Sequence, residues 1–238
     1  MAADNVPFLA SVSISRRGSP CYAASVSAGT KPGVERSYDR VAERYAEEFF
    51  DELRHKPLDR AVLGAFAELV GPDAAVADIG CGPGQVARDL QARGLRVIGI
   101  DVSPQMVAVA LRLTPGIDFR VGSMHALELP DASLAGITAF YAIVHLEPYQ
   151  LVGVFKELFR VLKPGGLLLL SFHVGRERVK RDELLGERVD LEFVFFDRKV
   201  VETALENAGF VIEMRMERAP YVAVEHPSTR GYLLARRP

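Results

Sequence analysis

The feature that most constrains the fold of this chain is the glycine-rich segment Asp78-Ile-Gly80-Cys-Gly82-Pro-Gly84. It begins at the end of a short apolar stretch, residues 75–79, and leads into a helical pattern over residues 85–92. Such a stretch is typical of a buried parallel strand. The sharp turn that follows favours glycine, which adopts positive φ angles without steric cost. Ligands of open α/β sheets bind in the crevice at the carboxyl ends of the strands, so the segment predicts a strand–loop–helix unit beside a ligand.

Strand and helix patterns alternate through most of the chain. Alternation of this kind predicts a Rossmann-like, doubly wound α/β sheet of seven mostly parallel strands with helices on both faces. The last two strands have no convincing helix between them, which predicts an antiparallel strand near the end. An amphipathic helix over residues 37–53 predicts an N-terminal helical cap. The predicted strands after the first are residues 96–100, 118–121, 135–140, 167–172, 210–216 and 231–236.

The spacing of the glycines limits which class of ligand the segment can bind. The pattern is an acid followed by GxGxG, which is neither the GxGxxG of dinucleotide folds nor the GxxxxGK[ST] of a P-loop. A carboxylate at Asp78 would repel a diphosphate, but it suits a ligand that carries an ammonium and a sulfonium. A nicotinamide-dependent oxidoreductase is the weaker alternative, because none of the seven tyrosines has a lysine four residues later.

A second acid, Asp101, ends the second predicted strand. A carboxylate at that position accepts hydrogen bonds from the hydroxyls of a ribose. Together with the glycine segment, Asp101 predicts a ligand that contains adenosine.

These motifs resemble those of the class I S-adenosylmethionine (SAM)-dependent methyltransferases, in their generalist, small-substrate branch. The resemblance covers about residues 37–238, with matches at 38–45, 78–84, 97–106, 122–130, 139–146 and 162–166. Family members often have aspartate where this chain has Ser123, and a serine hydroxyl accepts a hydrogen bond more weakly than a carboxylate. The resemblance implies SAM as cofactor and these binding residues: Tyr38, Tyr45, Asp78, Gly80, Cys81, Gly82, Gly84, Asp101, Val102, Met106, Ser123, Met124, Ala139 and Phe140.

Two histidines are candidate general bases, because an imidazole titrates near neutral pH. His145 follows the fourth predicted strand, where the family usually has a structural histidine, and His173 ends the fifth. Tyr38 and Tyr45 have two interpretations, core packing or cover over the methionine end of SAM. The charged stretch 174–196 is interpreted as a solvated lid.

Composition and charge indicate which partners and which location to expect. The net charge is −2, which favours neither nucleic acid nor an anionic membrane as partner. Two cysteines make no disulfide framework, and no apolar run is long enough for a membrane helix, so we expect a cytoplasmic protein. The histidines show no spacing typical of metal ligands, so we expect no metal site. Residues 1–35 are interpreted as a disordered tail or upstream extension, and residues 36–238 as the methyltransferase domain.

The predicted function is methyl transfer from SAM to a small or unidentified acceptor. A SAM-binding regulatory or scaffold protein without turnover is the alternative from another class. An oxygen or carbon acceptor that must lose a proton needs a base, whereas a neutral amine or a thiolate does not. The sequence leaves the acceptor atom and the oligomeric state open.

Overall fold

The computed structural model describes residues 33–238, so most of the predicted tail, residues 1–32, lies outside the described residues. The first helix, α1 (Val34–Phe49), begins within the range expected for the tail. It is followed by the short 3₁₀ turn η1 (Glu52–His55) and by α2 (Pro57–Val70). Pro57 is the first residue of α2, where its missing N–H costs no hydrogen bond.

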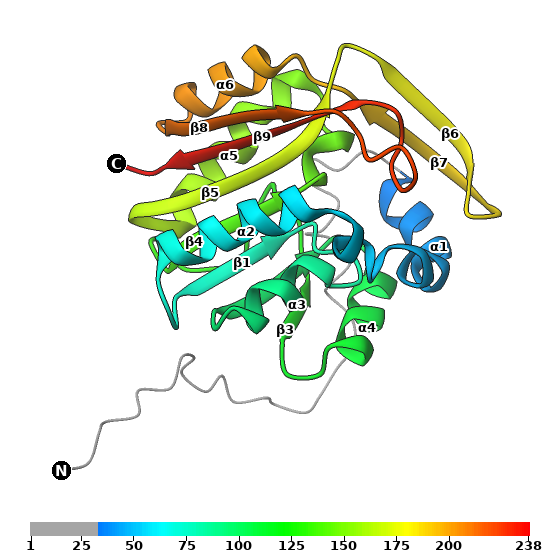
Figure 1. Cartoon of the computed structure of the whole chain (residues 1–238), viewed down its shortest axis with the longest axis horizontal. Coiled ribbons are helices and arrows are strands. Elements are labelled where there is room, and N and C mark those ends of the chain that lie inside the picture. The colour runs from blue at the N-terminus through cyan, green and yellow to red at the C-terminus, as the bar shows by residue number, and fades with distance from the viewer. Residues whose placement is uncertain (1–32) are drawn as a thin grey trace.

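The predicted seven-stranded, mostly parallel sheet is confirmed. Its strand order is β3-β2-β1-β4-β5-β9-β8, and Figure 1 shows helices on both sides of it. The strands β3, β2, β1, β4 and β5 are parallel to one another, whereas β9 is antiparallel to both of its neighbours, β5 and β8. The bounds are β1 Ala75–Ile79, β2 Arg96–Asp101, β3 Asp118–Val121, β4 Leu134–Phe140, β5 Leu162–Val174, β8 Val211–Arg218 and β9 Thr229–Arg236.

The direction of β9 matters for the site. Because β9 is antiparallel, its first residues lie at the edge of the sheet where the parallel strands end. Arg230 of β9 is therefore the partner of His173 near the end of β5. The strand β5 also begins earlier than its predicted start at Leu167, because Leu162 pairs with Leu134 of β4.

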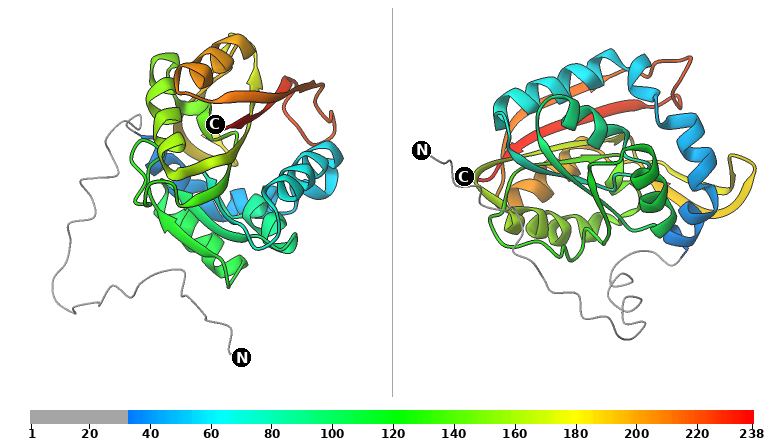
Figure 2. Two further views of the ribbon diagram at one scale, coloured as in Figure 1. Left: turned by 90° about the vertical axis from the view of Figure 1, so that its left-hand side faces the viewer. Right: turned by 90° about the horizontal axis from the view of Figure 1, so that it is seen from below.

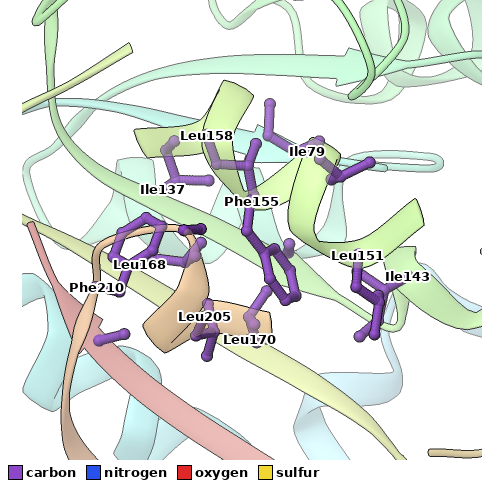
Figure 3. Close-up of a cluster of buried hydrophobic side chains, with 14 of the residues drawn as sticks. Ile79, Ile137, Ile143, Leu151, Phe155, Leu158, Leu168, Leu170, Leu205 and Phe210 are labelled. Atoms are coloured by element: carbon purple, nitrogen blue, oxygen red, sulfur yellow. The ribbon is translucent and has the colours of Figure 1, made fainter. Parts of the chain in front are cut away.

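The core forms two layers, one on each face of the sheet. The helices α5 (Leu151–Val161) and α6 (Arg198–Asn207) cover one face, and Figure 3 shows Phe155 of α5 among the aliphatic side chains of the strands. The helices α2 and α3 (Gln85–Ala92) cover the opposite face. Helix α4 (Pro104–Leu113) packs with α3 near β2 and β3. Apolar side chains on both faces hold the strand ends, and with them the polar residues that follow, in fixed positions.

A two-stranded hairpin, β6 (Arg178–Leu184) and β7 (Glu187–Val194), is inserted between β5 and α6. The charged stretch 174–196, interpreted from the sequence as a solvated lid, contains these two paired strands, with apolar residues on the inner side. Val189 and Leu191 pack against α1 and α4 in one buried cluster. Figures 1 and 2 show the hairpin projecting from the main sheet beside α1. The hairpin and α1 thus cover the same end of the molecule.

No helix within residues 33–238 combines the length and the apolar character that a membrane span requires.

Candidate functional site

A cavity of about 380 Å³ lies at the carboxyl ends of the parallel strands. Its walls come from the glycine segment, from the ends of β2, β4 and β5, from α1, and from the β6–β7 hairpin. Fourteen of the residues predicted from the sequence line it: Tyr38, Tyr45, Asp78, Gly80, Cys81, Gly82, Asp101, Val102, Met106, Ser123, Met124, Phe140, His145 and His173.

Gly84 and Ala139 were expected to contact the cofactor, but they are not among the residues that line the cavity. Gly84 has a φ of 91°, and a Cβ there would lie 2.7 Å from the ring of Phe119. It serves the close packing of α3 on β3. Ala139 is buried in the core on the α5 side of the sheet, because alternate residues of β4 face opposite layers.

Gly80 makes the turn out of β1. Its φ is 69°, and a Cβ there would lie 2.6 Å from the Cβ of Ala142. The N–H groups of Gly80 and Cys81 both donate to the carbonyl of Ile100, at 2.7 and 3.2 Å. This pairing to β2 fixes the loop as a wall of the cavity.

Asp78 carries an unsatisfied buried oxygen. Its Oδ1 accepts a hydrogen bond of 2.8 Å from the hydroxyl of Thr138 on β4, whereas Oδ2 has no partner within the described residues. Burial raises the pKa of this carboxyl to about 7, and Asp101 adds repulsion, while the bond from Thr138 and the nearby backbone N–H of Ala87 act in the opposite direction. A buried carboxylate without a counter-charge is costly, so Asp78 is set up to receive a cationic group.

Asp101 is held rigidly at the end of β2. Its Oδ2 accepts from the N–H of Gly82 and its Oδ1 from the N–H of Ser103, both at 2.9 Å. Burial raises its pKa, and these backbone bonds oppose the shift. Each carboxylate oxygen keeps a second lone pair, which suits acceptance from the hydroxyls of a ribose.

The cap helix is tied to the sheet through polar bonds. Oδ1 of Asp39 on α1 accepts from the hydroxyl of Ser103 at 2.6 Å and from the N–H of Gln105 at 3.0 Å, at the start of α4. The hydroxyl of Tyr38 lies 2.8 Å from Nε2 of His145. Nδ1 of His145 lies 2.9 Å from the carbonyl of Glu192 on β7, so Nδ1 carries the proton and Nε2 accepts from Tyr38. His145 therefore joins α1 to the hairpin with both ring nitrogens.

The loop after β3 forms another wall. The hydroxyl oxygen of Ser123 accepts from the N–H of His125 at 3.3 Å, and Ser123 is buried. Nε2 of His125, also on the cavity wall, is buried without a partner among residues 33–238. Ser123, Met124 and His125 thus present a hydroxyl, an apolar chain and an imidazole to one end of the cavity.

His173 occupies the other end. Its ring stacks on Phe195 at 4.7 Å between centroids and 15° between planes, and its Nδ1 lies 2.7 Å from the hydroxyl of Ser228. Burial, followed by the positive charge of Arg230, lowers its pKa to about 3. His173 is therefore a neutral imidazole at physiological pH.

Several lining residues were not predicted from the sequence. They include Lys56 after η1, Tyr141 after β4, and Glu225, His226 and Arg230 around the start of β9. Tyr141 directly follows β4 and has a φ of 53°, a conformation that is uncommon for residues other than glycine. Its position after a strand was a usable signal, whereas Lys56 and Glu225 come from connecting segments whose place depends on the tertiary fold.

The arrangement of the two acids fits SAM. The unpaired oxygen of Asp78 suits the ammonium of an amino acid, and Asp101 suits a ribose at the end of the next strand. Tyr38 and Tyr45 of α1 line the cavity, so α1 closes it on one side.

Comparison with known proteins supports the same family. The family model described as "Methyltransferase domain" matches residues 76–166. A probable S-adenosylmethionine-dependent methyltransferase of Mycolicibacterium smegmatis is 32% identical over 199 residues, which are 74% of this chain and 71% of that protein. The 2-methyl-6-phytyl-1,4-hydroquinone methyltransferase of Synechocystis is 38% identical, but over only 42% of this chain and 32% of that enzyme.

Among solved structures, a SAM-dependent methyltransferase from Methanosarcina mazei superposes with a TM-score of 0.65 at 20% identity, over 73% of this chain and 96% of that one. This likeness shows the shared fold. The family match and the M. smegmatis relative carry the assignment further: this chain belongs to the class I methyltransferases, enzymes that use SAM as methyl donor.

Proposed function

We propose that this chain transfers the methyl group of SAM to a small-molecule acceptor inside the covered cavity. The observation that carries the proposal is the unpaired, buried oxygen of Asp78 in a cavity that Asp101 also lines. Two elements of the chain, α1 and the hairpin, form part of the walls, so an acceptor has to fit a space bounded on several sides. The Synechocystis relative is named for a hydroquinone acceptor, which supports a small molecule over a macromolecule.

SAM supplies a methyl group on a positively charged sulfur, which is already a good leaving group. The protein's task is therefore alignment, which contributes about 7–11 kcal/mol in favourable cases. Asp78 holds the ammonium end and Asp101 the ribose. Tyr38 and Tyr45 cover the cavity and exclude water. The end of the cavity that contains His173 and Tyr141 is then left for the acceptor.

Binding without turnover is the second candidate function. It is favoured by one observation, that neither predicted base has the properties of one. Both nitrogens of His145 are engaged in structural hydrogen bonds, and the pKa of His173 is lowered to about 3. An acceptor that needs no proton removed would reconcile these observations with catalysis.

Conversion of SAM to S-adenosylhomocysteine (SAH), followed by mass spectrometry, tests the proposal. The purified chain is incubated with SAM and a panel of oxygen, nitrogen, sulfur and carbon acceptors. Formation of SAH together with a methylated acceptor supports the enzyme. Tight SAM binding with no turnover on the whole panel supports the binding protein instead.

For the location of the protein in the cell we propose the cytoplasm.

A further inference from the structure

The end of the cavity remote from Asp101 is built around a group of buried charges. Glu225 is the centre of this group, with its side chain 1% exposed. Arg218 holds it in a bidentate pair at 2.7 and 2.8 Å, and Lys56 Nζ lies 3.5 Å from Oε1. Nε of Arg230 lies 3.7 Å from the same oxygen, so three cations share one carboxylate.

Two of these cations have a second anionic partner. Lys56 Nζ lies 2.6 Å from Glu52, and Arg218 lies 2.7 Å from Asp59. Arg230 has no second anionic partner among the described residues. Its terminal nitrogens donate to the carbonyl of His226, and to the carbonyl and hydroxyl of Ser228. Those neutral acceptors position the guanidinium without neutralising it.

Arg230 lines the cavity although its side chain is only 3% exposed, and its Nε is buried without a hydrogen-bond partner in the described part of the chain. A guanidinium is always charged, and a buried charge that is incompletely paired is costly. The hydroxyl of Tyr141 is a second buried donor and makes no hydrogen bond of normal geometry within residues 33–238, although the nearby hydroxyl of Tyr232 influences its pKa. The centroid of the Tyr141 ring lies 5.7 Å from the guanidinium carbon of Arg230. Two buried donors whose hydrogen bonding is incomplete thus line one corner of the cavity.

We propose that this corner, formed by Arg230, Tyr141 and His173, is the acceptor subsite, and that it binds a compact acceptor that carries an anionic oxygen, such as a carboxylate. The proposal rests on the proposed function, since it assigns the substrate class of the same cavity. Arg230 supplies the counter-charge, the Tyr141 hydroxyl donates to the anion, and the stacked rings of His173 and Phe195 form an aromatic wall.

An acceptor of this class explains why the site does without a base. A lone pair of the anionic oxygen forms the bond to the methyl carbon while the carbon–sulfur bond breaks. The electron pair of that bond stays on sulfur and gives neutral SAH, so no proton has to move. A negative acceptor and a positive donor neutralise each other in the step, which a cavity of low dielectric constant favours.

Binding of matched probe pairs tests this inference. The full chain is saturated with SAH, which prevents turnover, and titrated with 4-hydroxybenzoate against 4-hydroxybenzamide, and with hexanoate against hexanamide. We expect each carboxylate to bind at least about tenfold more tightly than its amide, the discrimination typical of a charge-assisted hydrogen bond. Equal binding within both pairs, or binding of neither member, overturns the inference.

Variants of Arg230 and Tyr141 test whether these residues cause the preference for a carboxylate over its amide. Arg230→Gln should reduce the carboxylate-to-amide ratio to near one, and Tyr141→Phe should reduce it by a smaller factor. The matched control is Arg215→Gln, an exposed arginine on β8 that does not line the cavity, and it should keep the ratio of the wild type. An unchanged ratio in both Arg230→Gln and Tyr141→Phe contradicts the assignment.

SAH affinity, measured on the same samples, separates a failure of the acceptor inference from a failure of the proposed function. If the protein binds SAH but shows no carboxylate preference, the acceptor inference fails and the proposed function stands. If it binds no SAH, the proposed function itself fails. Should Arg230→Gln not fold, Tyr141→Phe and the wild-type ratios still decide the matter.

Discussion

The hydroxyl of Tyr38 on α1 lies 2.8 Å from Nε2 of His145, and Nδ1 of the same ring lies 2.9 Å from the carbonyl of Glu192 on β7. One imidazole thus connects the cap helix, the turn η2 (Ala142–His145) after β4, and the inserted hairpin. Because both nitrogens are occupied, we propose that the primary role of His145 is to hold the two elements that cover the cavity.

This role predicts a modest effect of His145→Gln on catalysis. Loss of a general base costs about 10²–10⁴ in rate, whereas loss of a structural contact acts through stability and SAM affinity. We expect kcat to fall by less than about tenfold, with a lower melting temperature and a higher Kd for SAM. A fall of kcat by 10³ with stability and SAM affinity unchanged would restore His145 as a catalytic base.

Tyr38→Phe tests the same bond from its other end. The variant keeps the ring and removes only the hydroxyl, which should cost about 1 kcal/mol of unfolding free energy. Urea unfolding measures the loss. A matched control is Tyr149→Phe, since Tyr149 is 82% exposed and should change stability little. Equal stabilities of the two variants would show that the Tyr38–His145 bond contributes nothing.

Asp101→Asn should weaken SAM binding by about 10- to 100-fold, because an amide is a weaker acceptor for ribose hydroxyls than a carboxylate. The side-chain oxygen of asparagine can still accept from one of the two backbone N–H groups that Asp101 now serves, whereas alanine accepts from neither. Calorimetric titration gives the Kd. The control Asp118→Asn, at the exposed start of β3, should bind SAM as the wild type does. Wild-type affinity in Asp101→Asn would rule out the ribose contact.

The pKa of Asp78 predicts how stability depends on pH in the absence of ligand. Burial raises this pKa from 3.8 to about 7, so between about pH 4 and 7 the folded protein holds a proton that the unfolded chain has released. The contribution of Asp78 to stability therefore declines as pH rises through this window and is constant above it. Asp78→Asn should remove that decline and be more stable than wild type at pH 8, by an amount on the order of a few kcal/mol. Identical pH profiles of unfolding for the two proteins would contradict the shift.

The same carboxyl predicts the opposite trend for SAM binding. Only the ionised form of Asp78 offers a counter-charge to the ammonium, so SAM affinity should rise as pH increases through about 7. In Asp78→Asn this rise should be much smaller and the affinity lower throughout, although the variant is the more stable protein. Titrations at pH 6 and 8 measure both effects. An affinity of the wild type that does not change with pH would remove Asp78 from the ammonium site.

Gly80→Ala should destabilise the protein by about 1–3 kcal/mol and weaken SAM binding. Its φ of 69° strains any other residue, and the new Cβ would lie 2.6 Å from that of Ala142. Gly153→Ala is the control, because Gly153 lies within α5 and a Cβ there meets nothing within 4 Å. That change should stabilise the protein by up to about 1 kcal/mol. Equal melting temperatures of the two variants would show that the turn tolerates a side chain.

The parallel sheet could be predicted because its signals are local. The strands β1 and β3 are each followed by a glycine and β2 ends on an acid, so Gly80 and Asp101 lie directly at strand ends. The role of Gly84 could not be read from the sequence, because a glycine that packs closely against Phe119 looks the same in sequence as one that contacts a ligand.

The hairpin and the buried charges could not be predicted in the same way. Val189 and Leu191 alternate with charged residues, and the direction in which they face depends on α1, about 150 residues earlier in the chain. Arg218, Asp59 and Tyr232 form a buried hydrogen-bonded group although Asp59 and Arg218 are 159 positions apart. Burial of such polar residues is decided by distant partners, which no local pattern reveals.

Calorimetric titration of the purified chain with SAH shows whether the cavity binds the nucleoside. We expect one binding site per chain, with a matching rise in melting temperature when SAH is present. No heat of binding and no thermal shift at millimolar SAH would contradict it.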